Sequence, residues 1–132
     1  MIVVDASVLV VALADDGDDG DAARVRLLDD ANIHAPHLID LEVASVLRRS
    51  LREGRIEARR ATLALKDLID LALVRYDHLP FIRRIWELRS NLTSYDAAYV
   101  ALAETLECTL VTGDRRIARA PGLHCRIEFL SV

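Results

Sequence analysis

The chain has 132 residues, of which 52% are hydrophobic and 29% are charged; this composition argues against disorder and fits one folded domain spanning residues 1–132. That length is sufficient to bury a hydrophobic core. With 17 basic and 21 acidic residues the formal net charge is −4, which is unfavourable for binding a polyanion unless several carboxylates are neutralised by another ligand.

The apolar segment at the start of the chain, residues 2–14, resembles a membrane anchor or an export signal at first sight. It contains Asp5, is shorter than the roughly 20 residues that span a bilayer, and has no basic residues before it. We therefore expect a cytoplasmic protein without a membrane segment.

Branched apolar residues and helical spacing predict alternating strands and helices in the first half of the chain. The expected elements are a strand at 2–4, helices at 6–14 and 21–30 separated by an acidic loop at 15–21, a strand at 33–35, a helix that begins at Pro36 and ends before Gly54, and a helix at 55–71.

The second half continues the alternation. The expected elements are a strand at 73–75, a helix at 78–88, a break at 91–94, an alanine-rich helix at 94–106, a strand at 109–112, a short helix at 114–120, a turn at 121–122 and a strand at 126–130. Strands separated by helices form a parallel sheet with right-handed crossovers. The predicted fold class is therefore α/β, with three layers (α/β/α) around a central parallel sheet of about four or five strands.

Two acidic residues follow predicted strands. Asp5 ends the first strand, and Asp114 comes shortly after the strand at 109–112. Ligands of open parallel sheets bind at the carboxyl ends of the strands, so both side chains are expected at the same edge of the sheet. Each residue has an equally good explanation as the N-cap of the helix that follows it, and the sequence leaves both interpretations open.

Two further acidic residues lie on predicted helices. Asp96 follows Thr93 by three positions, which is either a capping box or a helix start that offers Asp96 as a ligand. Three of the four side chains one turn away from Glu42 are apolar, so Glu42 borders a buried stripe, where a carboxylate is costly unless a cation or hydrogen-bond donors satisfy it. Nearby Asp40 is expected to support such a site only indirectly.

Carboxylates gathered in one crevice repel one another unless their pKa values rise or a metal neutralises them. A ligand set made only of oxygen atoms selects hard cations such as Mg²⁺ or Mn²⁺, which serve phosphoryl chemistry. The histidines and cysteines show no zinc-ligand spacing, and the sequence contains no glycine-rich phosphate loop and no Ser-His-Asp arrangement. These residues therefore indicate an acidic metal site directed at phosphate.

Four segments resemble, in order and spacing, the four motifs of PIN-domain ribonucleases. They are Val3–Leu9 (VVDASVL), Pro36–Ala44 (PHLIDLEVA), Tyr95–Ala103 (YDAAYVALA) and Leu110–Asp114 (LVTGD). In length and detail the chain resembles the VapC toxins of bacterial type II toxin–antitoxin systems, and this resemblance covers nearly the whole chain.

The resemblance implies roles for individual residues. The implied catalytic and metal-binding residues are Asp5, Glu42, Asp96 and Asp114, and the implied supporting hydroxyl groups are those of Ser7 and Thr112. Some relatives carry one more acidic residue after the last motif, whereas Arg115 and Arg116 follow it here, so the number of metal ions stays open.

The resemblance also implies an activity and partners. The implied function is a Mg²⁺- or Mn²⁺-dependent endoribonuclease, a hydrolase that cleaves structured RNA such as tRNA or rRNA. The implied assembly is a homodimer that a cognate VapB-type antitoxin inhibits.

Residues outside the acidic site are candidates for contacts with RNA and with protein partners. Arg115, Arg116 and the arginine-rich stretch 48–60 are candidate RNA contacts, although a solvated helix face explains that stretch equally well. Apolar helix positions offer a groove for the antitoxin or a dimer face, with core packing as the ordinary interpretation. These positions are Leu27, Leu63 and Leu65.

Two other functions compete with a nuclease. One is a catalytically silent PIN-like module that binds RNA or a protein partner. The other is a phosphatase or phospho-receiver, which also places Asp at strand ends but needs a second acid two positions later, or an acidic pair with a lysine. Ser7 occupies the first of these positions, and the only lysine, Lys66, lies in a predicted helix.

Overall fold

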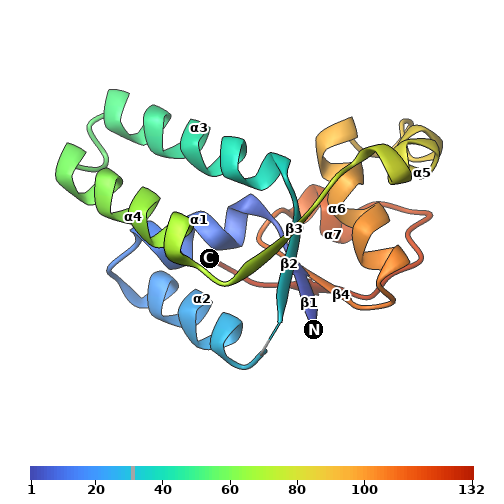
Figure 1. Cartoon of the computed structure of the whole chain (residues 1–132), viewed down its shortest axis with the longest axis horizontal. Helices are drawn as coiled ribbons and strands as arrows, with labels where there is room; N and C mark the ends of the chain where they lie inside the picture. Colours follow the sequence, from blue (N-terminus) through green and yellow to red (C-terminus); the bar gives the residue numbers. More distant parts are fainter. Residues whose placement is uncertain (31) are drawn as a thin grey trace.

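The centre of the molecule is a sheet of five parallel strands in the order β3-β2-β1-β4-β5 (Figure 1). The computed structural model describes residues 1–30 and 32–132. The strands are β1 (Ile2–Val4), β2 (Ile33–Pro36), β3 (Leu73–Tyr76), β4 (Thr109–Thr112) and β5 (Ile127–Phe129). The predicted α/β fold and its five strands are therefore confirmed.

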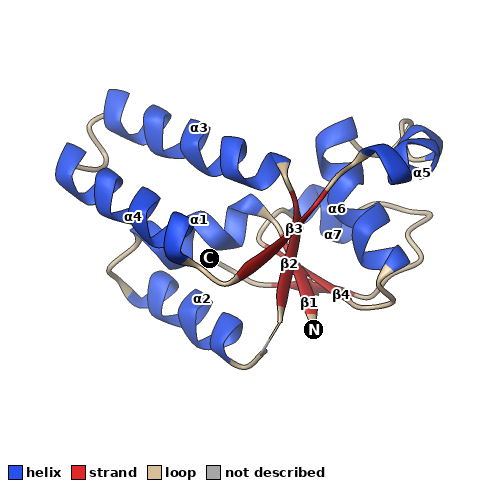
Figure 2. Ribbon diagram, viewed as in Figure 1, coloured by secondary structure: helices blue, strands red, loops and turns tan. Residues whose placement is uncertain are grey.

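Helices cover the sheet on both sides (Figure 2). The helices α1, α2, α3 and α4 lie on one side, and α5, α6 and α7 lie on the other. Their bounds are α1 (Ala6–Ala14), α2 (Asp18–Leu28), α3 (Leu38–Arg52), α4 (Ala58–Asp70), a 3₁₀ turn η1 (Leu79–Phe81) that leads into α5 (Ile82–Glu87), α6 (Ser94–Thr105) and α7 (Arg115–Arg119). In the part of the chain that the structure describes, no helix is long and apolar enough to cross a membrane.

The strand order reverses between β1 and β4, and this reversal brings together the segments that carry the candidate site residues. The chain builds β1, β2 and β3 outward in one direction and then returns to place β4 on the opposite side of β1. Val4 pairs with Val111, and the Asp5 N–H donates to the Val111 carbonyl at 3.3 Å. Such a switch point leaves a crevice at the carboxyl ends of the two strands. The residues that follow β1 and β4 therefore meet.

Helix α6 is the most deeply buried helix on its side of the sheet. An unbroken run of its residues, Ala97–Ala103, is buried, and the alanines in that run allow close approach to β1, β2 and β4. Its exposed first turn carries Thr93 as the N-cap and Asp96 beside the carboxyl ends of the strands. Close packing of α6 thus fixes the position of its acidic first turn.

Several predicted boundaries were wrong, each for a physical reason. Helix α2 begins at Asp18 rather than 21, because acidic residues in its first turn interact favourably with the helix dipole. Pro36 ends β2 instead of starting a helix, because it is still paired with Tyr76 of β3. The next N–H, that of His37, donates to the Tyr76 carbonyl at 2.9 Å. Helix α4 starts at Ala58, after the turn at Gly54, whose φ is 69°.

The predicted helix at 78–88 is divided into η1 and α5, with a proline at the start of the 3₁₀ turn. Of the candidate groove residues, Leu27 is part of the core, whereas Leu63 and Leu65 are exposed. The ordinary interpretation therefore holds for Leu27 alone.

The close approach of α2 to the end of α1 requires glycine at position 20. A Cβ there would lie 1.9 Å from the Asp15 carbonyl oxygen, which is backbone and cannot move independently. Gly20→Ala is expected to lower the free energy of unfolding by about 1–3 kcal/mol in urea denaturation. The exposed neighbour Asp19 provides the control, since Asp19→Ala should change stability by less than about 0.5 kcal/mol. Equal stability of Gly20→Ala and the wild type would contradict this account.

Candidate metal centre

An open cavity of about 620 Å³ lies at the carboxyl ends of β1 and β4. The carboxylates predicted from the sequence all line it, although they come from four separate segments of the chain. They are Asp5, Glu42, Asp96 and Asp114. Apolar side chains, Ser7 and the arginines Arg49 and Arg116 form the rest of the wall. The sequence-based expectation that these acids share one crevice is therefore borne out by the structure.

Asp5 is the most buried of these acids, with only 4% of its surface exposed. Its Oδ1 accepts a hydrogen bond from the Ser7 hydroxyl at 2.5 Å and from the Val8 N–H at 3.3 Å, and its Oδ2 accepts one from the Thr112 hydroxyl at 2.5 Å. The bond from Val8 makes Asp5 the N-cap of α1. Capping and pocket lining, which the sequence left as alternatives, are thus simultaneous.

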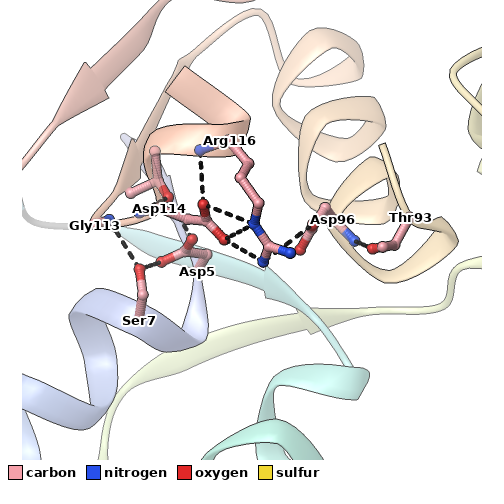
Figure 3. Close-up of polar contacts among 8 residues, drawn as sticks. Asp5, Ser7, Thr93, Asp96, Gly113, Asp114 and Arg116 are labelled. Atoms are coloured by element: carbon pink, nitrogen blue, oxygen red, sulfur yellow. Dashed lines mark hydrogen bonds and ion pairs between the residues drawn. The ribbon is translucent and has the colours of Figure 1, made fainter. Parts of the chain in front are cut away.

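The hydroxyls of Ser7 and Thr112 connect Asp5 to the loop after β4. The Ser7 hydroxyl accepts from the Gly113 N–H at 2.8 Å, and the Thr112 hydroxyl accepts from the Asp114 N–H at 2.9 Å (Figure 3). Because these N–H groups donate to the hydroxyls, the hydroxyl protons point to Asp5. Each hydroxyl therefore fixes one carboxylate oxygen of Asp5.

Glu42 is held from the opposite side of the pocket by α6. The Tyr99 hydroxyl donates to Glu42 Oε2 at 2.5 Å, and only 1% of the Tyr99 surface is exposed. The apolar neighbours of Glu42 in the sequence indicated that its carboxylate would need a hydrogen-bond donor. The buried Tyr99 hydroxyl is that donor and satisfies one of the two carboxylate oxygens. Among the residues that the structure describes, none donates a hydrogen bond to the other carboxylate oxygen, Oε1, which lies free for a second partner.

Asp96 and Asp114 face each other across the Arg116 side chain (Figure 3). Arg116 Nη2 lies 2.6 Å from Asp114 Oδ2 and 4.0 Å from Asp96 Oδ2. Asp114 also accepts from the Arg116 N–H at 2.7 Å and so caps α7. Asp96 lies in the first turn of α6, and its N–H donates to the hydroxyl of the N-cap Thr93 at 3.1 Å. Both helix starts thus direct a carboxylate toward the same space.

The pocket concentrates negative charge away from water. Burial raises the pKa values of Asp5, Glu42 and Asp96, and the charge of Asp114 raises those of Asp5 and Asp96 further. Hydrogen bonds from Arg116 instead lower the pKa of Asp114. A bound cation would relieve both the desolvation and the mutual repulsion of these carboxylates.

The donor chemistry of the pocket fits a hard divalent cation. Its charged lining consists of carboxylates and arginines, and the carboxylates form an oxygen-only donor set of the kind that binds Mg²⁺ or Mn²⁺. Among the residues that the structure describes, no three acidic, histidine or cysteine side chains are close enough together to form a finished coordination site. The guanidinium of Arg116, which carries a single positive charge, lies between the carboxylates of Asp96 and Asp114.

Other residues considered from the sequence lie elsewhere. Asp40 forms a two-pronged ion pair with Arg75, with separations of 2.8–3.0 Å, and so holds α3 against β3. The Arg115 guanidinium lies 5.7 Å from the centre of the Phe129 ring. Of the arginine-rich stretch, Arg49 lines the pocket.

Sequence reasoning missed two pocket interactions. Tyr99 lies three positions after Asp96, a spacing that places both on one side of α6, but its contact with Glu42 joins residues 57 positions apart. Arg116 was predicted as a possible RNA contact, and its pairing with Asp114 and Asp96 was not foreseen.

Comparisons with known proteins agree with this geometry. The sequence matches the PIN domain family over residues 2–123. It is 46% identical over 127 residues to VapC ribonuclease Mb0985 of Mycobacterium bovis, covering 96% of each protein. PAE2754 from Pyrobaculum aerophilum superposes with a TM-score of 0.68 at 26% identity, covering 92% of this chain and 86% of that one. VapBC2 from Rickettsia felis, bound to a promoter DNA fragment, superposes with a TM-score of 0.65 at 16% identity over 98% of each chain, which supports the fold alone.

Removing the charge of Glu42 is expected to stabilise the metal-free protein. Glu42→Gln keeps an oxygen that accepts from the Tyr99 hydroxyl, and it removes the carboxylate charge. Burial disfavours that charge and raises the pKa of Glu42. Because a raised folded-state pKa costs stability above that pKa, the unfolding temperature at pH 7.5 should rise by about 2–4 °C. The gain should shrink as the pH falls and Glu42 becomes protonated in the wild type. A gain of equal size at pH 7.5 and pH 4.5 would contradict this explanation.

Removing the Tyr99 hydroxyl is expected to have the opposite effect. Tyr99→Phe leaves the Glu42 carboxylate without its buried donor and should cost about 1.5–3 kcal/mol of unfolding free energy. In the Glu42→Gln background the cost should be clearly smaller, because the acceptor is then neutral. Urea denaturation of the two single variants and the double variant measures this coupling. Additive costs would show that the hydroxyl does not stabilise the charge.

Proposed function

We propose that this chain, which belongs to the PIN domain family and resembles its VapC ribonucleases at 46% identity, hydrolyses phosphodiester bonds with Mg²⁺ or Mn²⁺ held by its acidic pocket. The chain is a toxin endoribonuclease of the VapC type. The observation that carries the metal proposal is the gathering of carboxylates from four separate segments around one cavity. They are Asp5, Glu42, Asp96 and Asp114.

Each acid has a distinct position in this proposal. Asp5 is the most buried and most firmly oriented ligand of the proposed site, because two hydroxyl groups donate to its carboxylate oxygens. Asp96 and Asp114 approach from the first turns of α6 and α7, and Glu42 approaches from α3 with one oxygen held by Tyr99. When bound, the divalent ion would polarise the phosphodiester and stabilise the charge on the leaving oxygen.

The hydroxyls and Tyr99 act on the acids rather than on the substrate. Ser7 and Thr112 orient Asp5 through bonds of 2.5 Å, and both are themselves fixed by backbone N–H groups after β4. Ligand carboxylates commonly need such hydrogen-bonded support to keep their geometry. We assign Ser7, Thr112 and Tyr99 this positioning role.

RNA would enter from the open side of the pocket. The exposed ring of Tyr95 and the side chain of Arg49 lie at this opening, where a stacked base and a phosphate respectively would find partners. Two divalent ions would neutralise the four pocket acids and bring the formal charge to zero (−4 + 4), and one ion would halve it; either change weakens the general repulsion of a polyanion. Structured RNA such as tRNA or rRNA is the proposed substrate class.

A VapB-type antitoxin is the proposed partner. The structure from Rickettsia felis that shares this fold is of VapBC2. Two exposed side chains one turn apart on α4, Leu65 at 37% and Ile69 at 77%, provide an apolar surface for a partner or for a second copy in a homodimer. Leu63, at 45%, lies on another face of the same helix. The cytoplasmic location remains a prediction from the sequence.

Cleavage should depend on both the metal and the acids. Purified wild-type protein is expected to cut tRNA or rRNA in Mg²⁺ or Mn²⁺ and to lose this activity in excess chelator. Asp96→Asn should reduce the rate by at least about 100-fold, because it removes a carboxylate charge from the metal site. Mapping of RNA 5′ ends on a sequencing gel measures both effects.

The matched control is Asp67→Asn, which makes the same change at an exposed position on α4 and should leave the rate unchanged. Cleavage that survives chelator or Asp96→Asn would overturn the metal-site assignment. RNA binding by the wild type without any cleavage would favour the catalytically silent module.

A further inference from the structure

We propose that Arg116 is an internal counter-cation of the acidic pocket, which competes with the divalent ion and must be displaced when that ion binds. The proposal rests on the proposed function, because it takes the pocket carboxylates to be the metal ligands. It adds a residue that sets how tightly the metal is held.

The first support is the geometry of the guanidinium (Figure 3). Arg116 Nη2 lies 2.6 Å from Asp114 Oδ2, and Nε lies 3.2 Å from both carboxylate oxygens of Asp114. The same Nη2 lies 4.0 Å from Asp96 Oδ2. A cation thus already stands between the two carboxylates that approach from α6 and α7.

The second support is that the guanidinium and a metal ion need the same atoms. Asp114 Oδ1 also accepts the Arg116 backbone N–H at 2.7 Å, so this oxygen caps α7 whether or not the side chain is present. Of the two oxygens, Asp114 Oδ2 is therefore the more available to a metal. It is also the oxygen that Arg116 Nη2 contacts, at 2.6 Å. Simultaneous binding of both cations to Oδ2 would place two positive charges within a few ångströms of each other.

The third support is the contrast in burial between the partners. The Arg116 side chain is 75% exposed, whereas those of Asp96 and Asp114 are 18% and 21% exposed. Exposed ion pairs of arginine contribute little to stability, so the guanidinium can leave without disturbing the fold. The acids stay in place because the first turns of α6 and α7 hold them. The arginine is thus the exchangeable member of this cluster.

Arg115 supplies a matched control next to Arg116. Both residues belong to α7, and both carry one positive charge at an exposed position. The Arg115 guanidinium lies over the Phe129 ring, and Arg115 does not line the pocket. Replacing Arg115 removes the same net charge from the protein without removing the ion pair.

Isothermal titration of the full chain with Mn²⁺ tests the proposal. Arg116→Ala is expected to bind Mn²⁺ about tenfold more tightly than the wild type, whereas Arg115→Ala should stay within about twofold of it. Arg116→Lys, which keeps the charge without the planar two-pronged contact, should lie between Arg116→Ala and the wild type. Equal affinities of Arg116→Ala and Arg115→Ala would overturn the proposal.

Thermal unfolding gives an independent readout. Saturating Mn²⁺ should raise the unfolding temperature of Arg116→Ala by more than that of the wild type, because the stabilisation grows with affinity at a given Mn²⁺ concentration. An equal or smaller rise in Arg116→Ala would contradict the competition.

Asp96→Asn separates the failure of this proposal from the failure of the proposed function. If the wild type binds Mn²⁺, Asp96→Asn loses that binding and Arg116→Ala matches the wild type, the metal site stands and only the competition is overturned. If the wild type binds no Mn²⁺, or if Asp96→Asn binds it as well as the wild type, the metal site itself is wrong and the competition falls with it.

Discussion

The parallel pairing of β1 with β4 is the constraint on which the rest of the structure depends. It places Asp5, at the end of one strand, beside Thr112 and Asp114, at the end of the other, although more than 100 residues separate them. A carboxylate buried at this point would be costly without donors, and the hydroxyls of Ser7 and Thr112 provide them. The acidic pocket thus lies where the two central strands pair.

Acids of the pocket both stabilise helix starts and line the cavity. Asp5 and Asp114 cap the helices that follow them, and Asp96 stands in the first turn of α6. Capping fixes the side chains of Asp5 and Asp114 against the backbone, whereas Asp96 is placed by the backbone of the first turn of α6. These side chains line a shared cavity, where burial raises the pKa values of Asp5 and Asp96. Because Arg116 and the hydroxyl donors compensate these buried charges only in part, a divalent cation would stabilise them further.

Much of this arrangement follows from the sequence, because its determinants are local. The branched run Ile2–Val4 followed by Asp5 predicts both the buried strand and the acid at its end, and strand–helix alternation predicts the parallel sheet. Boundaries controlled by tertiary contacts were not predictable. Pro36 ends β2 because His37 bonds to Tyr76 on β3, a contact between residues far apart in the sequence. The Tyr99–Glu42 bond and the Arg116 position escaped prediction because the sequence does not show which helices face the pocket.

The central claim is that these carboxylates bind one or more divalent ions at the junction of β1 and β4. Anomalous diffraction from crystals of the wild-type protein grown with Mn²⁺ tests it most directly. The account predicts an anomalous peak in the pocket with oxygen ligands from Asp5, Asp96 and Asp114 at about 2.2 Å. It also predicts that Arg116 has moved away from Asp114. Absence of a peak at saturating Mn²⁺, or a peak elsewhere on the protein alone, would contradict it.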